Sequence, residues 1–269
     1  RNVPFVHSVE EDPFFQCYSV VDERSAGYFA LGLSQQIQEP VVISCTASTA
    51  SCNYWPPVAE AFYQGVPIIV LTSDRNPAML GQWEDQMIDQ VGMFDRHVRK
   101  SVNLPEVKNH DDFIYCQRLV NEAFLELNHK GTGPAHINIP MKSYNNSFNV
   151  KELPEVTKIE RLEVSSEVTK WIDKIEKLKN SNRILLICGQ NSNISESLDE
   201  GVRHFFRYFN SSIIVDYMSN IDCEDALKTT VAMDTLYVTN KKCEEFRPGM
   251  VISFGVNVTS GIKGMLCRN

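Results

Sequence analysis

The chain has 269 residues, of which 26 are Lys or Arg and 34 are Asp or Glu, so its formal net charge at pH 7 is −8. This acidic balance argues against a nucleic-acid-binding surface, which needs clustered positive charge. No apolar run approaches the roughly 18–20 residues of a membrane-spanning helix. Hydrophobic residues make up 43 % of the chain and charged residues 22 %, as in ordinary globular proteins, and the length suffices for one large domain or two ordinary ones.

Short apolar segments alternate with helical patterns in the first half of the chain. We expect strands at residues 16–21, 41–45, 66–71 and 135–140. We expect helices from Ser25 to before Pro40, through residues 58–63 up to Gly65, and over residues 111–127. Strands separated by helix-length connections predict parallel βαβ units with helices on both faces of a sheet.

The composition changes near residue 150. Eleven of the twelve prolines lie at or before Pro154, and residues 143–163 carry Asn, Ser and mixed charges without a clear period. A second alternation follows, with helices over 165–179 and 196–209 and strands at 183–188, 212–217 and 250–255. The predicted fold is therefore α/β: two open, mainly parallel-sheet domains, residues 1–150 and 164–269, joined by a linker at residues 151–163.

The eight cysteines and six histidines show no metal-binding pattern. The cysteines are scattered without a Cys-x-x-Cys pair, and the histidines lack ligand spacing. Several cysteines lie inside apolar strands, as Cys45 does, where Cys behaves as a small hydrophobe. We therefore expect no metal site and no disulfide framework in this chain, a pattern typical of a reduced, cytoplasmic protein.

Polar segments directly follow three of the predicted strands, at residues 22–24, 46–51 and 73–75. In open parallel sheets, ligands bind beyond the carboxyl ends of the strands. The shared position of these segments therefore predicts a binding site at that edge of the first sheet.

Two charged residues in these segments each have two interpretations. Glu23 either stabilises the N-terminus of the helix that follows or presents a carboxylate that exchanges a proton with a ligand. Arg75 either forms an ion pair with Asp74 or Asp85, or clamps a ligand carboxylate with its guanidinium fork. The sequence alone leaves both alternatives open.

Five segments of the first half together carry a family resemblance. They are residues 21–33 (VDERSAGYFALGL), 53–61 (NYWPPVAEA), 65–75 (GVPIIVLTSDR), 85–94 (DQMIDQVGMF) and 133–140 (GPAHINIP). In order and spacing they resemble the thiamine-diphosphate enzymes of menaquinone synthesis, the 2-succinyl-5-enolpyruvyl-6-hydroxy-3-cyclohexene-1-carboxylate (SEPHCHC) synthases. Arg1-Asn2-x-Pro4 resembles the tail of the Pro-Gly-Ser-Arg-Asn motif of that family.

The resemblance implies a domain assignment. The family has a pyrimidine-binding, a middle and a diphosphate-binding α/β domain. Residues 1–150 resemble the pyrimidine-binding domain without its N-terminal start, and residues 164–269 resemble the middle domain. The diphosphate-binding domain, with its metal-binding Gly-Asp-Gly…Asn motif, is absent from this chain, so the fragment alone is expected to be inactive. The intact enzyme is expected to be a cytoplasmic homodimer or homotetramer.

The resemblance also implies a reaction and a cofactor. The family decarboxylates 2-oxoglutarate and adds the resulting carbanion to isochorismate, using thiamine diphosphate with Mg²⁺ or Mn²⁺. Glu23 matches the glutamate that hydrogen-bonds the pyrimidine ring of the cofactor and activates it. Gln86 matches a polar residue that faces the reacting groups. Glu23 and Gln86 are therefore the expected catalytic residues.

Further residues match the binding positions of the family. Arg1 and Arg75 match arginines that contact substrate carboxylates. Gln86 is also expected to contact substrate. Lys263 lies near the position of a basic pair of the family and is assigned to substrate binding as well. Ser48 and Thr49 are assigned to the cofactor pocket, although the Ser-Gly-Thr turn of the family reads Ala47-Ser48-Thr49 here. Residues 83–85 (WED) likewise differ from the usual Gly-Ala-Asn.

Two other functions remain alternatives at this point. One is a different thiamine-diphosphate enzyme, such as a relative of acetolactate synthase, which shares the glutamate and the domain plan but lacks the Asp74-Arg75 pattern. The other is a non-catalytic α/β module that serves assembly.

Overall fold

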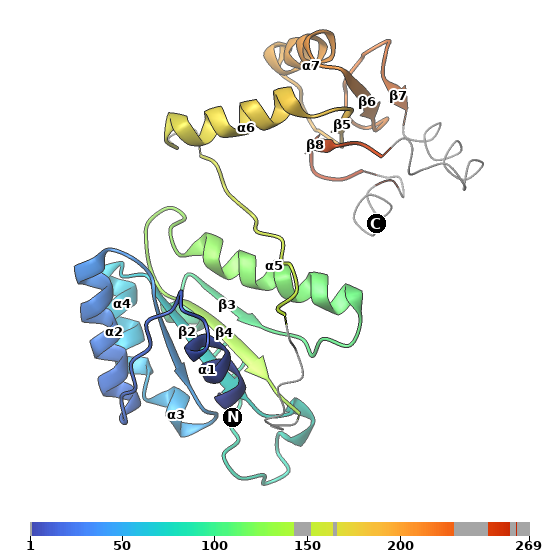
Figure 1. Cartoon of the computed structure of the whole chain (residues 1–269). Helices are drawn as coiled ribbons and strands as arrows, with labels where there is room; N and C mark the ends of the chain where they lie inside the picture. The colour runs from blue at the N-terminus through green and yellow to red at the C-terminus, as the bar shows by residue number, and fades with distance from the viewer. Residues whose placement is uncertain (1, 143–151, 164–165, 229–246, 259–261, 263–269) are drawn as a thin grey trace. The chain divides into compact units, whose positions relative to one another are not determined.

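The computed structural model describes residues 2–142, 152–163, 166–228, 247–258 and 262. The chain divides into two compact units, Arg1–Arg161 and Leu162–Asn269. The division falls within the segment predicted to be a linker, and each unit contains its own sheet (Figure 1). The two units are described separately below.

The first unit contains a four-stranded sheet in the order β1-β2-β4-β3, in which every neighbouring pair is parallel. Its strands are β1 (Val41–Cys45), β2 (Ile68–Asp74), β3 (Lys100–Asn103) and β4 (Ala135–Pro140). All seven residues of β2 are buried, as expected for a central strand covered on both faces. The bounds predicted for β1 and β4 are confirmed.

Helices cover both faces of this sheet (Figure 1). The unit contains α1 (Val3–Glu10), α2 (Glu23–Ile37), α3 (Thr49–Cys52), α4 (Trp55–Gln64) and α5 (His110–Glu126), with 3-10 turns at Pro77–Met79 and Asp95–His97. Helix α4 ends at Gly65, the residue predicted to stop it, because glycine readily adopts the φ of +68° found there.

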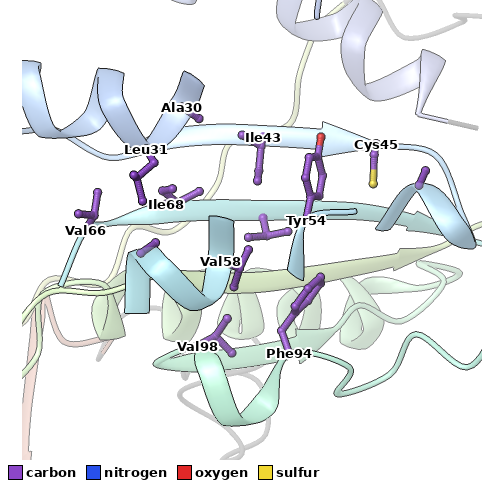
Figure 2. Close-up of a cluster of buried hydrophobic side chains, with 13 residues drawn as sticks. Ala30, Leu31, Ile43, Cys45, Tyr54, Val58, Val66, Ile68, Phe94 and Val98 are labelled. Atoms are coloured by element: carbon purple, nitrogen blue, oxygen red, sulfur yellow. The ribbon is translucent and has the colours of Figure 1, made fainter. Parts of the chain in front are cut away.

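Two hydrophobic cores follow from the alternation of side chains along β2. Ile68 and Val70 point to one face, where they pack with α2, α4 and the buried Phe94 (Figure 2). Ile69 and Leu71 point to the other face, where they pack with α5. Each core holds its helices against the strands of the sheet.

The strand predicted at residues 16–21 is wrong. These residues have no regular structure and are exposed, with Val21 completely so. A strand requires a neighbour for its backbone hydrogen bonds, and in the described part of the chain no strand lies beside this segment. Strand β3 was not expected, because its Lys-Ser-Val-Asn sequence is short and largely polar.

The second unit is also an α/β unit with a parallel sheet, in the order β7-β6-β5-β8. Its strands are β5 (Ile184–Cys188), β6 (Ser211–Val215), β7 (Leu227–Lys228) and β8 (Met250–Phe254), and its helices are α6 (Val168–Asn180) and α7 (Glu196–Tyr208). Val202 of α7 packs on β5 and β6. The predicted fold class, two open parallel-sheet α/β units, is confirmed.

Candidate functional site

Glu23 is the first residue of α2, and its neighbour Asp22 caps that helix. Asp22 has extended backbone dihedrals, and its Oδ1 accepts a hydrogen bond from the backbone N–H of Ser25 at 2.7 Å. The hydrogen bond from Ser25 lowers the pKa of Asp22. Because Asp22 supplies the cap, the half-buried Glu23 carboxylate is not needed as a cap, and as an acid in the first turn it still interacts favourably with the helix dipole.

The Glu23 carboxylate acts electrostatically on the end of β1. Burial first, and then the negative charge of Glu23, raise the pKa of the Cys45 thiol to about 12. The pKa of Tyr54 is raised by burial, by Cys45 and by Glu23. Figure 2 shows Cys45 and Tyr54 at the carboxyl end of β1. Glu23 therefore lies near enough to this strand end for its charge to act on two buried side chains, Cys45 and Tyr54.

The turn after β1 contains Ser48 and Thr49, the two residues predicted for a cofactor pocket. Ser48 is buried and has φ +73° and ψ −131°, and its backbone N–H donates to Oε1 of Gln90 at 2.6 Å. Its carbonyl accepts a hydrogen bond from the Ser51 hydroxyl at 2.6 Å. Thr49 begins α3 and is exposed. The structure thus places both residues beyond the same strand end that Glu23 acts on.

Arg75 directly follows β2 and is 9 % exposed. Its Nη1 lies 2.7 Å from Oε1 of Glu84, and its Nη2 lies 2.7 Å from Oδ1 of Asp85. The pairing with Asp85 was one predicted alternative, whereas Asp74 instead accepts the backbone N–H of Arg75. The buried Nε of Arg75 has no hydrogen-bond partner among the residues that the structure describes. The guanidinium group therefore binds two carboxylates of this chain, those of Glu84 and Asp85.

Gln86 lies on the exposed loop that carries these two carboxylates. It has φ +48° and follows Asp85 directly, so its backbone lies beside the Arg75 ion pairs. Arg1 and Lys263, the other predicted substrate-binding residues, lie outside the described residues. The structure therefore places five of the seven predicted site residues: Glu23, Ser48, Thr49, Arg75 and Gln86.

A buried polar network connects the ends of β2 and β4, and no local sequence pattern indicates it. The Asn138 amide accepts from Thr72 at 2.7 Å and from Gln90 at 3.1 Å. It also donates to Asp74 and to Asn103, each at 2.8 Å. All four hydrogen bonds that an Asn side chain can make are therefore formed.

His136 extends this network. Its ring nitrogens lie 2.8 Å from the Thr72 hydroxyl and 2.9 Å from the Ser101 hydroxyl. Burial lowers the pKa of His136 to about 4, so the ring is neutral at pH 7. These residues are too far apart in the sequence for a local pattern to reveal them.

The described part of the chain shows no metal site and no membrane span. Its His, Cys, Asp and Glu side chains form no group of three or more that could hold a metal ion. No helix in the described ranges is long and apolar enough to cross a bilayer.

Comparison with known proteins first identifies the class. Residues 1–93 match the family model described as the thiamine pyrophosphate enzyme N-terminal TPP binding domain. This stretch contains Glu23, the turn at Ser48 and Thr49, and Arg75 with its two carboxylate partners. The predicted resemblance to thiamine-diphosphate enzymes is thereby confirmed.

Curated relatives then narrow the class. The chain is 46 % identical over 191 residues to the SEPHCHC synthase of Bacteroides thetaiotaomicron, covering 71 % of this chain and 34 % of the relative. It is 37 % identical over 261 residues to that of Phocaeicola vulgatus and 30 % identical over 263 residues to that of Flavobacterium johnsoniae, covering 97 % of this chain and 46 % of each relative. The chain is thus homologous to SEPHCHC synthases and spans between a third and a half of their length.

Proposed function

We propose that the chain supplies the pyrimidine-binding part of a thiamine-diphosphate-dependent SEPHCHC synthase. Such an enzyme decarboxylates 2-oxoglutarate and adds the product to isochorismate. The observation that carries the proposal is Glu23, a half-buried carboxylate at the start of α2 that leaves the helix cap to Asp22 and whose charge acts on Cys45 at the end of β1. The homology to SEPHCHC synthases supports this assignment over a relative of acetolactate synthase or a silent assembly module.

The residues around Glu23 fit the aminopyrimidine end of the cofactor. A carboxylate whose charge acts on the buried end of β1 can accept a hydrogen bond from a ring nitrogen and share its proton. The exposed Thr49 and the Ser48 turn border the same strand end. Thiamine diphosphate, when bound, supplies the carbon nucleophile and electron sink of the reaction.

Substrate recognition falls to the basic residues. Both substrates are dicarboxylates, so an acidic protein has to place positive charge locally. Arg75 binds a substrate carboxylate by exchanging it for Glu84 or Asp85, and Gln86 lies beside that exchange. Arg1 and Lys263 add positive charge at the same substrates.

The remaining groups are assigned to parts outside this chain. The diphosphate and its Mg²⁺ or Mn²⁺ bind the third domain of the family. The complete enzyme acts in the cytoplasm as a homodimer or homotetramer, with the pyrimidine-binding unit of one subunit facing the third domain of another. Residues 164–269 serve as its middle domain.

The test replaces Glu23 with Gln in the complete protein that carries this chain. Loss of general acid–base catalysis typically reduces turnover by about 10²–10⁴-fold, so we expect at least a 100-fold loss with an unchanged circular dichroism spectrum. Asp22→Asn is the matched control, because it removes the same charge one residue away and keeps a good helix cap. Near-normal turnover of Glu23→Gln would refute the role of Glu23.

Substrate pairs test the reaction itself. The wild-type protein is assayed with 2-oxoglutarate plus isochorismate and, separately, with pyruvate alone. We expect product only from the first mixture. Product from pyruvate alone assigns the chain to the acetolactate synthase group, and a complete protein that acts on neither mixture supports the assembly module.

A further inference from the structure

Ser48 has a backbone conformation that a side chain disfavours. Its φ of +73° lies in the region that glycine enters freely and other residues rarely adopt. Ser48 is 7 % exposed, and it is the N-cap residue of the short helix α3 within the turn assigned above to the cofactor. Some contact must therefore hold this turn in place.

Gln90 provides that contact. It is completely buried, and its Oε1 accepts the Ser48 N–H at 2.6 Å. Its Nε2 donates to the Ser73 carbonyl at 3.1 Å and to Oδ1 of Asn138 at 3.1 Å. Both N–H donors and the oxygen acceptor of the Gln90 carboxamide are used. Only one orientation of the amide group satisfies these three hydrogen bonds.

The same contacts connect the turn to the Arg75 strand end. Ser73 lies two residues before Arg75 in β2, and Asp74 between them accepts both the Arg75 N–H and an Asn138 N–H. Gln90 itself follows the loop that carries Glu84 and Asp85, the partners of Arg75. One buried side chain therefore joins the end of β1, the end of β2 and the ion-paired loop.

We propose that Gln90 is a positioning residue of the active site. It holds Ser48 in the conformation that a glycine would adopt unaided, and it fixes the Ser48–Thr49 turn relative to Arg75. Gln90 acts through these groups and touches neither substrate nor cofactor. The proposal rests on the proposed function in one respect, the assignment of the Ser48–Thr49 turn to the cofactor.

A double-mutant cycle tests this role, with Gln90→Met, Ser48→Gly and the two combined. Met keeps nearly the length and volume of Gln but forms none of its three hydrogen bonds. Gly at position 48 can adopt the same backbone conformation without the steric cost that a side chain causes. If Gln90 holds the strained turn, Gln90→Met weakens the binding of thiamine diphosphate when Ser48 is present and has almost no effect on that binding in the Ser48→Gly background.

The first measurement is hydrogen exchange of the amide at residue 48, made on this chain. Loss of one net hydrogen bond corresponds to about a tenfold faster exchange in Gln90→Met. The second measurement is the dissociation constant of thiamine diphosphate in the complete protein. The cost of positive φ predicts about 5–30-fold weaker binding in Gln90→Met, and we expect less than about a threefold effect in the Ser48→Gly background.

Leu119→Ala serves as the control for general destabilisation. Leu119 belongs to the core on the opposite face of the sheet, so its truncation lowers stability without touching the turn. We expect Leu119→Ala to leave both measurements unchanged. If Gln90→Met does not fold, recovery of folding by added Ser48→Gly supports the proposal, and absence of recovery overturns it.

Three results overturn the positioning role. They are unchanged exchange and affinity in Gln90→Met, an equal effect of Gln90→Met on the affinity for thiamine diphosphate in both backgrounds, and a matching loss in Leu119→Ala. Failure of the proposed function gives a different result, in which the wild-type complete protein binds no thiamine diphosphate. The exchange measurement still reports on Gln90 in that case.

Discussion

Substitution of Gly27 tests how closely α2 has to approach α4. A Cβ at Gly27 would lie 2.4 Å from Cγ and 2.9 Å from Cβ of Pro57, which belongs to the first turn of α4. The proline ring is rigid and cannot turn aside. Gly27→Ala therefore has to push the two helices apart, and α2 is the helix that begins with Glu23.

Gly32 of the same helix provides a matched control. A Cβ at Gly32 would meet nothing within 4 Å. Each substitution gains the helix propensity of Ala over Gly, about 0.8–1 kcal/mol. The difference between the two variants cancels this gain and leaves the overpacking at Pro57, about 1–3 kcal/mol. We expect Gly32→Ala to stabilise the first unit and Gly27→Ala to destabilise it.

The assay follows thiol labelling of Cys45 during urea titration, read peptide by peptide in a mass spectrometer. Cys45 is 3 % exposed and packs in the core beneath α2 and α4, so its labelling reports the opening of the first unit alone. The midpoint and slope of the curve give the free energy of unfolding. Equal stability of Gly27→Ala and Gly32→Ala would refute the packing argument.

Two further outcomes are expected. Replacing both carboxylates on Arg75, Glu84→Gln with Asp85→Asn, should lower the KM for 2-oxoglutarate about three- to tenfold in the complete protein, because an ion pair with a solvent-accessible carboxylate contributes up to about 1 kcal/mol. An increase in KM would show that these carboxylates hold Arg75 in place. Acid should destabilise the first unit through His136: its folded pKa of about 4 lies below the ordinary 6.5, so the unfolded state binds the proton first. Stability is then full above pH 6.5 and falls toward pH 4 by about 3 kcal/mol, and urea titrations of His136→Gln should lack this fall.

Much of the fold could be predicted from local patterns. The bounds of β1 and β4 and the end of α4 at Gly65 follow from apolar runs and a single glycine. The segment at residues 16–21 has an equally suitable composition, but strand formation depends on a neighbour that composition does not report. Strand β3 forms for the opposite reason, since pairing with β4 overrides its polar sequence.

Position in the sheet made only part of the site predictable. Arg75 could be chosen because it follows strand β2, whereas Glu23 was chosen after residues 16–21, which form no strand, and on its match to the family glutamate. Only the structure shows that Asp22 caps α2. Gln90 had no local signal, because its partners Ser48 and Asn138 lie 42 and 48 residues away. The positive φ of Ser48 is indicated only by the family resemblance, because the family has a glycine where this chain has Ser48.

The saturated hydrogen bonding of Asn138 restricts how this protein can diverge. Replacing Asn138 alone would remove a buried hydrogen-bond partner from each of Thr72, Gln90 and Asp74, and each loss costs about 1–3 kcal/mol of stability. A protein in which only one of these hydrogen-bonded residues has changed is therefore less stable than one in which its partners have changed as well. Among homologous sequences, we expect these positions to be inherited and exchanged together, as a block drawn from three separate stretches of the chain.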